Sequence, residues 1–113
     1  MDLWNELVSK QKQLDASVRE LRRSGTALAE AERTYKLKLR EECLRLRGQE
    51  MPVTLIDKVC YGIPEVAELR FRRDCARVVY DANMDAINAL KLEMRIISNQ
   101  LQREWGQAGT GSM

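Results

Sequence analysis

The residues best suited to covalent or metal chemistry are three cysteines, Cys43, Cys60 and Cys75, which are spaced by 17 and 15 residues. Neither spacing gives the Cys-x-x-Cys pair that binds zinc or exchanges disulfides. The chain contains no histidine, so the commonest general base and the commonest metal ligand are both missing. We therefore expect reduced, mostly buried thiols that pack in the core. We also expect no cofactor, no metal site and no enzymatic activity.

Carboxylate pairs offer a second kind of chemistry. Asp81 and Asp85 are one helical turn apart, and Glu41 and Glu42 are adjacent. Such pairs can hold a divalent cation, although pairs on a solvated helix face are far more common. We interpret both pairs as solvated.

Basic residues are concentrated in the middle of the chain. Residues 33–77 carry eleven Lys and Arg against seven Asp and Glu, whereas the rest of the chain carries eight against ten. The overall charge is only +2, which excludes both a polybasic tail and an acidic DNA mimic. We predict an interaction surface formed by seven arginines: Arg40, Arg45, Arg47, Arg70, Arg72, Arg73 and Arg77. The alternative is an ordinary solvated face, in which the arginines cover Phe71 or form helical ion pairs.

The elements that position these residues are predicted to be helices, because apolar residues recur with a helical period and breakers are few. We expect helices over residues 2–47, 54–61 and 64–105, with Gly48 as a C-cap, Thr54 as an N-cap and Pro64 at a first helical position. Ser24-Gly25-Thr26 interrupts the first helix, so a continuous or kinked helix and two separate helices both remain open.

Two apolar periods stand out. Leu7, Leu14, Leu21 and Leu28 are seven residues apart, whereas the last helix shows an eleven-residue recurrence. This recurrence runs through Cys75, Val79, Ala82, Ala86, Leu90, Met94, Ile97, Leu101 and Trp105. Opposed supercoil preferences disfavour a regular two-stranded coiled coil. We therefore expect an apolar surface that a second protomer covers, with the four leucines as the self-association surface.

Together these features predict an all-α fold: an antiparallel hairpin of long helices with a short helix at the turn, assembling into a dimeric helical bundle. Residues 1–106 form the single domain and residues 107–113 form a disordered tail. The longest wholly apolar runs are two or three residues, and the first residues lack the layout of a secretory signal. We expect a cytoplasmic protein that does not contact membranes.

Three stretches resemble small helical proteins encoded by phages and prophages of Gram-positive bacteria. They are residues 51–56 (MPVTLI), residues 65–70 (EVAELR), and Tyr80 followed by residues 85–93 (DAINALKLE) and Glu104-Trp105. The resemblance covers roughly residues 29–106. It implies a viral or prophage origin, a bacterial host and an accessory role among recombination, replication or counter-defence genes. It carries no catalytic residues over to this chain.

Two hypotheses about function follow. The first is a non-enzymatic binding protein that occupies a surface of a nucleic-acid-processing or defence complex, as an anti-CRISPR-type inhibitor does. The second is a direct nucleic-acid-binding accessory of phage recombination or replication, which would use the basic turn end. Only Tyr61 and Phe71 accompany these arginines in the sequence, fewer aromatic residues than a single-strand stacking platform requires, so the first hypothesis is preferred.

Overall fold

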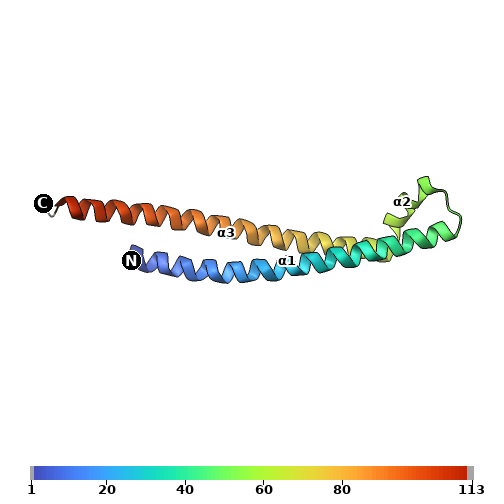
Figure 1. Ribbon diagram of the computed structural model, residues 1–113, viewed down its shortest axis with the longest axis horizontal. Helices are drawn as coiled ribbons and strands as arrows, with labels where there is room; N and C mark the ends of the chain where they lie inside the picture. The colour runs from blue at the N-terminus through green and yellow to red at the C-terminus, as the bar shows by residue number, and fades with distance from the viewer. Residues whose placement is uncertain (1, 112–113) are drawn as a thin grey trace. The chain divides into compact units, whose positions relative to one another are not determined.

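The computed structural model describes residues 2–111, with side chains up to residue 106 (Figure 1). It contains three helices, α1 (Leu3–Gly48), α2 (Val53–Gly62) and α3 (Pro64–Gly111), and no strand among the described residues. The predicted all-α class is therefore confirmed. The chain divides into two compact units, one of residues up to Arg22 with those from Ala82 onward, the other Arg23–Asp81.

Helix α1 begins at a capping aspartate that the sequence analysis overlooked. The Asp2 carboxylate accepts a hydrogen bond from the backbone N–H of Trp4 at 3.0 Å, which satisfies one of the unpaired donors of the first turn. The helix then runs through Ser24-Gly25-Thr26 without a break. Gly25 lies against Tyr80: a Cβ atom at this position would be 3.4 Å from Cε2 of that ring, an ordinary contact distance. Of the two alternatives, the continuous helix is the one found.

The end of α1 corrects the predicted role of Gly48. The left-handed residue is Glu50, with φ 61°, and no glycine has positive φ among the described residues. The N–H of Met51 donates to the Leu46 carbonyl at 3.3 Å, and the N–H of Glu50 donates to the Arg47 carbonyl at 3.0 Å. These two bonds form a Schellman motif. Met51 also packs against the buried cluster that contains Leu46, and the motif forms with glutamate in place of glycine.

The remaining boundaries depend on the two prolines. Pro52, not Thr54, is the N-cap of α2, and no side chain caps this helix. The Pro52 carbonyl accepts hydrogen bonds from the N–H groups of Leu55 and Ile56. Helix α3 begins at Pro64, the residue at which the sequence predicts its start, and extends to Gly111 rather than ending at Trp105. A single Gly106 is therefore not a sufficient stop. Residues 107–111 of the predicted disordered tail thus belong to this helix. Their side chains, and residues 112–113, lie outside the described residues.

Both long helices bury residues with a period of seven. On α1, the buried and half-buried side chains include Leu7, Leu14, Leu21, Leu28, Tyr35 and Glu42. On α3, they include Val66, Arg73, Tyr80, Ile87, Met94 and Leu101. The predicted eleven-residue face of α3 is therefore wrong in its first half, where Cys75, Val79, Ala82 and Ala86 are exposed. Arg73 is a charged residue on the face that α3 packs against α1, here called the seam. A pattern of apolar residues alone therefore does not reveal the seven-residue period of α3.

The helices run antiparallel within each unit. In the second unit, residue numbers rise along α1 as those of the facing residues fall along α3. The facing pairs are Gly25 with Tyr80, Tyr35 with Arg73, and Lys38 with Glu65. In the first unit, Lys10 Nζ lies 2.7 Å from Glu93 Oε2. Ile87, Ile97 and Leu101 form its buried apolar core.

Candidate functional site

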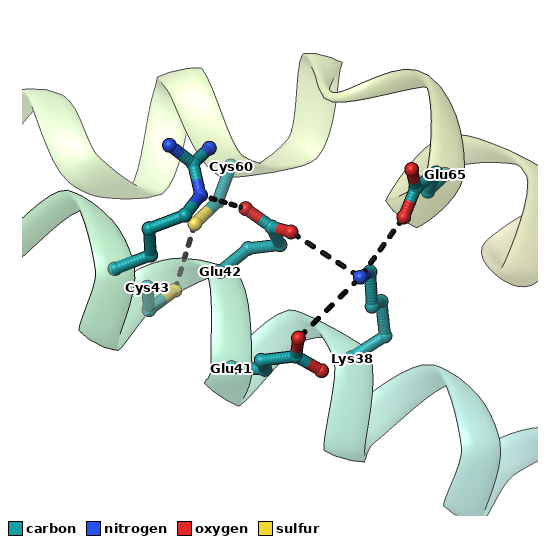
Figure 2. A network of polar contacts seen from close by, with 7 residues as sticks. Lys38, Glu41, Glu42, Cys43, Cys60 and Glu65 are labelled. Carbon is teal, nitrogen blue, oxygen red and sulfur yellow. Dashed lines mark hydrogen bonds and ion pairs between the residues drawn. The ribbon is translucent and has the colours of Figure 1, made fainter.

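The second unit contains a network of charges between α1 and the start of α3 (Figure 2). Lys38 Nζ lies 2.9 Å from Glu65 Oε2, 3.3 Å from Glu42 Oε1 and 3.6 Å from Glu41 Oε1. Arg45 Nε donates to Glu42 Oε2 at 2.6 Å. Glu42 is buried, so its two cationic partners satisfy the requirement that a buried charge be paired. Of the two glutamates interpreted as solvated, Glu41 is exposed beside Lys38, whereas the interpretation is wrong for Glu42.

The network holds its members in their charged forms. The hydrogen bond from Arg45, more than that from Lys38, lowers the pKa of Glu42 from its usual value of 4.5. Hydrogen bonding to Glu65, then to Glu42, raises the pKa of Lys38 well above its usual value of 10.5. Both pKa shifts are away from neutrality, whereas a general acid or base at neutral pH needs a pKa near 7. The network is therefore suited to holding α3 on α1.

Two thiols lie directly beside this network. Cys43 Sγ on α1 and Cys60 Sγ on α2 are 2.9 Å apart (Figure 2). Cys60 is fully buried and Cys43 is half-buried. The prediction of buried thiols thus fits Cys60 best, and it is wrong for Cys75, which is exposed. Sequence spacing gave no signal for the pair, because the two residues meet only when α2 folds back onto α1.

Four of the seven predicted arginines have partners within the second unit. Arg73 is half-buried, with its guanidinium carbon 4.6 Å from the centre of the Tyr35 ring. Arg70 lies 5.7 Å from the centre of the Tyr61 ring. Arg45 pairs with Glu42, and Arg72 with Glu68 at 3.1 Å. The ion pairs match the alternative interpretation. Its other part is wrong, because Phe71 is 62% exposed and the arginines lie over Tyr35 and Tyr61 instead.

The other three predicted arginines, Arg40, Arg47 and Arg77, are exposed. None of their side chains forms an ion pair or hydrogen bond with the described part of the chain. Arg40 and Arg47 lie on α1 and are seven residues apart, so they share one helix face. Arg77 lies on α3. The structure therefore divides the predicted cluster, and Arg40 and Arg47 are the two exposed members that share one helix face.

Arg40 and Arg47 belong to a longer pattern that the sequence analysis did not single out. It consists of Arg33, Leu37, Arg40, Leu44 and Arg47, and is called here the arginine–leucine stripe. Successive members are separated by four and three residues, the spacing of one helix face. All five are exposed, Leu37 at 62% and Leu44 at 55%. The signal in the sequence was the seven-residue spacing of the three arginines.

The leucines proposed for self-association have a different position. Leu7, Leu14 and Leu21 are half-buried in the first unit, and Leu28 is half-buried in the second. They share a helix face with Lys10, which pairs with Glu93 of α3. They therefore belong to the seam between α1 and α3, and are not a spare surface.

Comparison with known proteins gives no relative for this chain. No protein-family model, curated protein or solved structure matches it. Within residues 2–111, no helix combines the length and apolar character needed to cross a bilayer. In the same range, no three Cys, Asp or Glu side chains gather as metal ligands.

Proposed function

We propose that this protein is a non-enzymatic binding protein that docks an acidic, amphipathic helix of another protein on the arginine–leucine stripe. The resemblance to phage and prophage proteins suggests that this partner belongs to a nucleic-acid-processing or defence complex. The observation that carries the proposal is the alternation, on one helix face, of exposed leucines with arginines that have no partner among the described residues.

The arginines favour an acidic partner. Arg33, Arg40 and Arg47 place three positive charges along one face of α1, and no acidic side chain belongs to the stripe. Carboxylates at seven-residue intervals on a facing helix would lie opposite them. Arginine pairs with carboxylates through two parallel hydrogen bonds, which gives such a contact both strength and direction.

The leucines favour a protein over nucleic acid. Leu37 and Leu44 expose more than half of their surface, and burying a leucine side chain contributes about 1.5–3 kcal/mol. A phosphate backbone offers no apolar group to cover them. A facing helix with its own apolar residues at seven-residue intervals would cover both, as in helix-in-groove and coiled-coil recognition.

The same alternation argues against a second copy on this stripe. Two identical stripes would bring arginines from both copies to one seam, where like charges repel. An acidic partner has the opposite charge at those positions. The partner is therefore a different chain.

A defined peptide tests this proposal. A helical peptide of about three heptads is designed with Leu at the positions facing Leu37 and Leu44 and Glu at those facing the arginines. Binding is measured by fluorescence anisotropy, with a peptide of the same composition in scrambled order as the control. We expect the designed peptide to bind and the scrambled peptide to bind much more weakly.

Nucleic acid is the competing outcome. Single-stranded and duplex DNA are measured under the same conditions, with salt varied. If DNA binds more tightly than the peptide, with the steep salt dependence of phosphate contacts, the alternative function of a nucleic-acid-binding accessory replaces the proposal. If neither the peptide nor DNA binds, the stripe is only a solvated face and the proposal is wrong.

A further inference from the structure

The contact between Cys43 and Cys60 is closer than packing requires. Their sulfur atoms are 2.9 Å apart, whereas a disulfide bond measures about 2.05 Å, so closure needs an approach of only about 0.9 Å. The two residues come from different helices, α1 and α2, and are joined by the short connection at Gln49–Pro52. The fold thus brings two thiols 17 residues apart in the chain into bonding range.

The surroundings of the two thiols differ. Cys60 is fully buried with Leu46 and Ile56, and Leu39, Met51 and Ile63 pack against this cluster. Burial, together with the contact with Cys43, raises the pKa of the Cys60 thiol to about 11. Cys43 is only half-buried. A reagent in solution therefore reaches Cys43 first, and Cys60 is held behind it.

We infer that Cys43 and Cys60 form a redox-active dithiol that is oxidised to an intramolecular disulfide by low-molecular-weight disulfides. This modification site is independent of the arginine–leucine stripe, because it depends on a different pair of side chains and on α2. Its substrate class is a small symmetrical disulfide such as oxidised glutathione.

The reaction proceeds in two exchange steps. The Cys43 thiolate attacks one sulfur of the small disulfide, forms a mixed disulfide and releases one thiol, which takes up a proton. The Cys60 sulfur then attacks the Cys43 sulfur, loses its own proton to solvent, and displaces the second thiol. The dithiol loses two electrons and two protons in total, and one small disulfide becomes two thiols.

Proximity makes the second step the favoured one. Once Cys43 carries a mixed disulfide, the Cys60 sulfur is already positioned beside it, at a high effective concentration. Cys75 provides an internal comparison, because it is exposed and no other cysteine lies beside it. We expect Cys75 to stop at the mixed disulfide and Cys43 to pass through it.

The test uses the full chain with Cys75→Ser, which leaves only the two thiols of the pair. The protein is incubated with oxidised glutathione, denatured, treated with a maleimide reagent and weighed by mass spectrometry. We expect no maleimide label, no glutathione adduct and a mass lower by about 2 Da than that of the reduced protein. The control is Cys43→Ser with Cys75→Ser, in which we expect Cys60 to remain reduced and to take one label after denaturation.

A second readout uses the wild-type chain and does not depend on a variant. Proteolysis without reduction should release a peptide pair joined through Cys43 and Cys60, and oxidation should raise the unfolding midpoint by several degrees, because the bond closes a loop in the unfolded chain. In the Cys75→Ser protein, maleimide labelling of both thiols or a lasting glutathione adduct on Cys43 would show that the pair does not close. Either result would overturn the inference.

Discussion

At the scale of single residues, Glu50 shows how the chain turns without the glycine that its sequence suggests. It has a φ of 61° and lies at the position where Schellman motifs usually have glycine. The left-handed region is unfavourable for a residue with a Cβ atom. The preceding Gly48 lies in α1 with no positive φ, and a Cβ atom there would meet nothing within 4 Å.

We predict that Glu50→Gly raises the free energy of unfolding by about 0.5–1 kcal/mol, because relief of the left-handed strain exceeds the added flexibility of the unfolded chain. Gly48→Ala is the matched variant, and we expect it to stabilise by up to about 1 kcal/mol through helix propensity. Urea unfolding of both variants measures the effects. Destabilisation by Gly48→Ala, with no gain from Glu50→Gly, would show that Gly48 is the capping residue after all.

Glu42 is the residue whose charge depends most on the fold, because it is buried between Arg45 and Lys38. Its pKa is lower in the folded protein than its usual value of 4.5. A lowered pKa adds stability above pH 4.5, and this stability is lost as the pH falls through the folded-state pKa. We predict that Glu42→Gln is less stable than the wild type at pH 7 and that the difference shrinks as the pH falls below 4.5.

Thermal unfolding of both proteins across this pH range measures the effect. The control is Glu41→Gln, which removes a carboxylate that is more than two-thirds exposed and lies farther from Lys38. We expect this control to change stability little at any pH. An equal loss for Glu42→Gln at pH 7 and pH 3 would mean that packing, not charge, accounts for the role of Glu42.

At the scale of elements, the sequence predicts the three helices and the start of α3, because prolines, few glycines and apolar periodicity act locally. It does not predict the seam of α3, because Arg73 and Asn83 occupy half-buried seam positions. A reading that follows only apolar residues misses such a seam. The thiol pair and the ring of Tyr35 under Arg73 are also tertiary features, which depend on how the helices face one another.

At Gly25, in the second unit, both helix propensity and packing against Tyr80 decide the effect of a substitution. A Cβ atom would lie 3.4 Å from the Tyr80 ring, an ordinary contact distance. We predict that Gly25→Ala stabilises by up to about 1 kcal/mol, whereas Gly25→Leu destabilises because its longer side chain displaces Tyr80. Circular dichroism during thermal unfolding compares them. Equal stabilisation by both substitutions would contradict the packing of Tyr80 on Gly25.

At the scale of the whole molecule, we still expect self-association, but through a different surface from the one first proposed. Leu14 and Leu21 are half-buried in the seam. Helix α3 instead exposes a short apolar row within the second unit, in which Phe71, Cys75 and Val78 share one helix face and Phe71 and Val78 are each more than half exposed. Such an apolar row is unusual on a soluble monomer.

We predict a dimer in sedimentation experiments at tens of micromolar, and dissociation by Phe71→Lys with Val78→Lys while the helix content is kept. Leu14→Asp should instead lower the unfolding midpoint, because it places a charge in the seam. A wild-type monomer at that concentration would disprove the dimer. If Leu14→Asp instead gives a folded monomer, the four leucines first predicted are the self-association surface.

The central claim is that leucines and arginines of one helix face bind one acidic protein partner, and its most direct test separates the two residue types. Anisotropy with the designed acidic peptide and with duplex DNA is measured for three proteins: wild type, Leu37→Ala with Leu44→Ala, and Arg40→Ala with Arg47→Ala. We predict that both double variants weaken peptide binding at least tenfold, since each loses more than about 1.4 kcal/mol. The claim is contradicted if wild type binds DNA more tightly than the peptide, if the leucine variant binds as well as wild type, and if only the arginine variant loses binding.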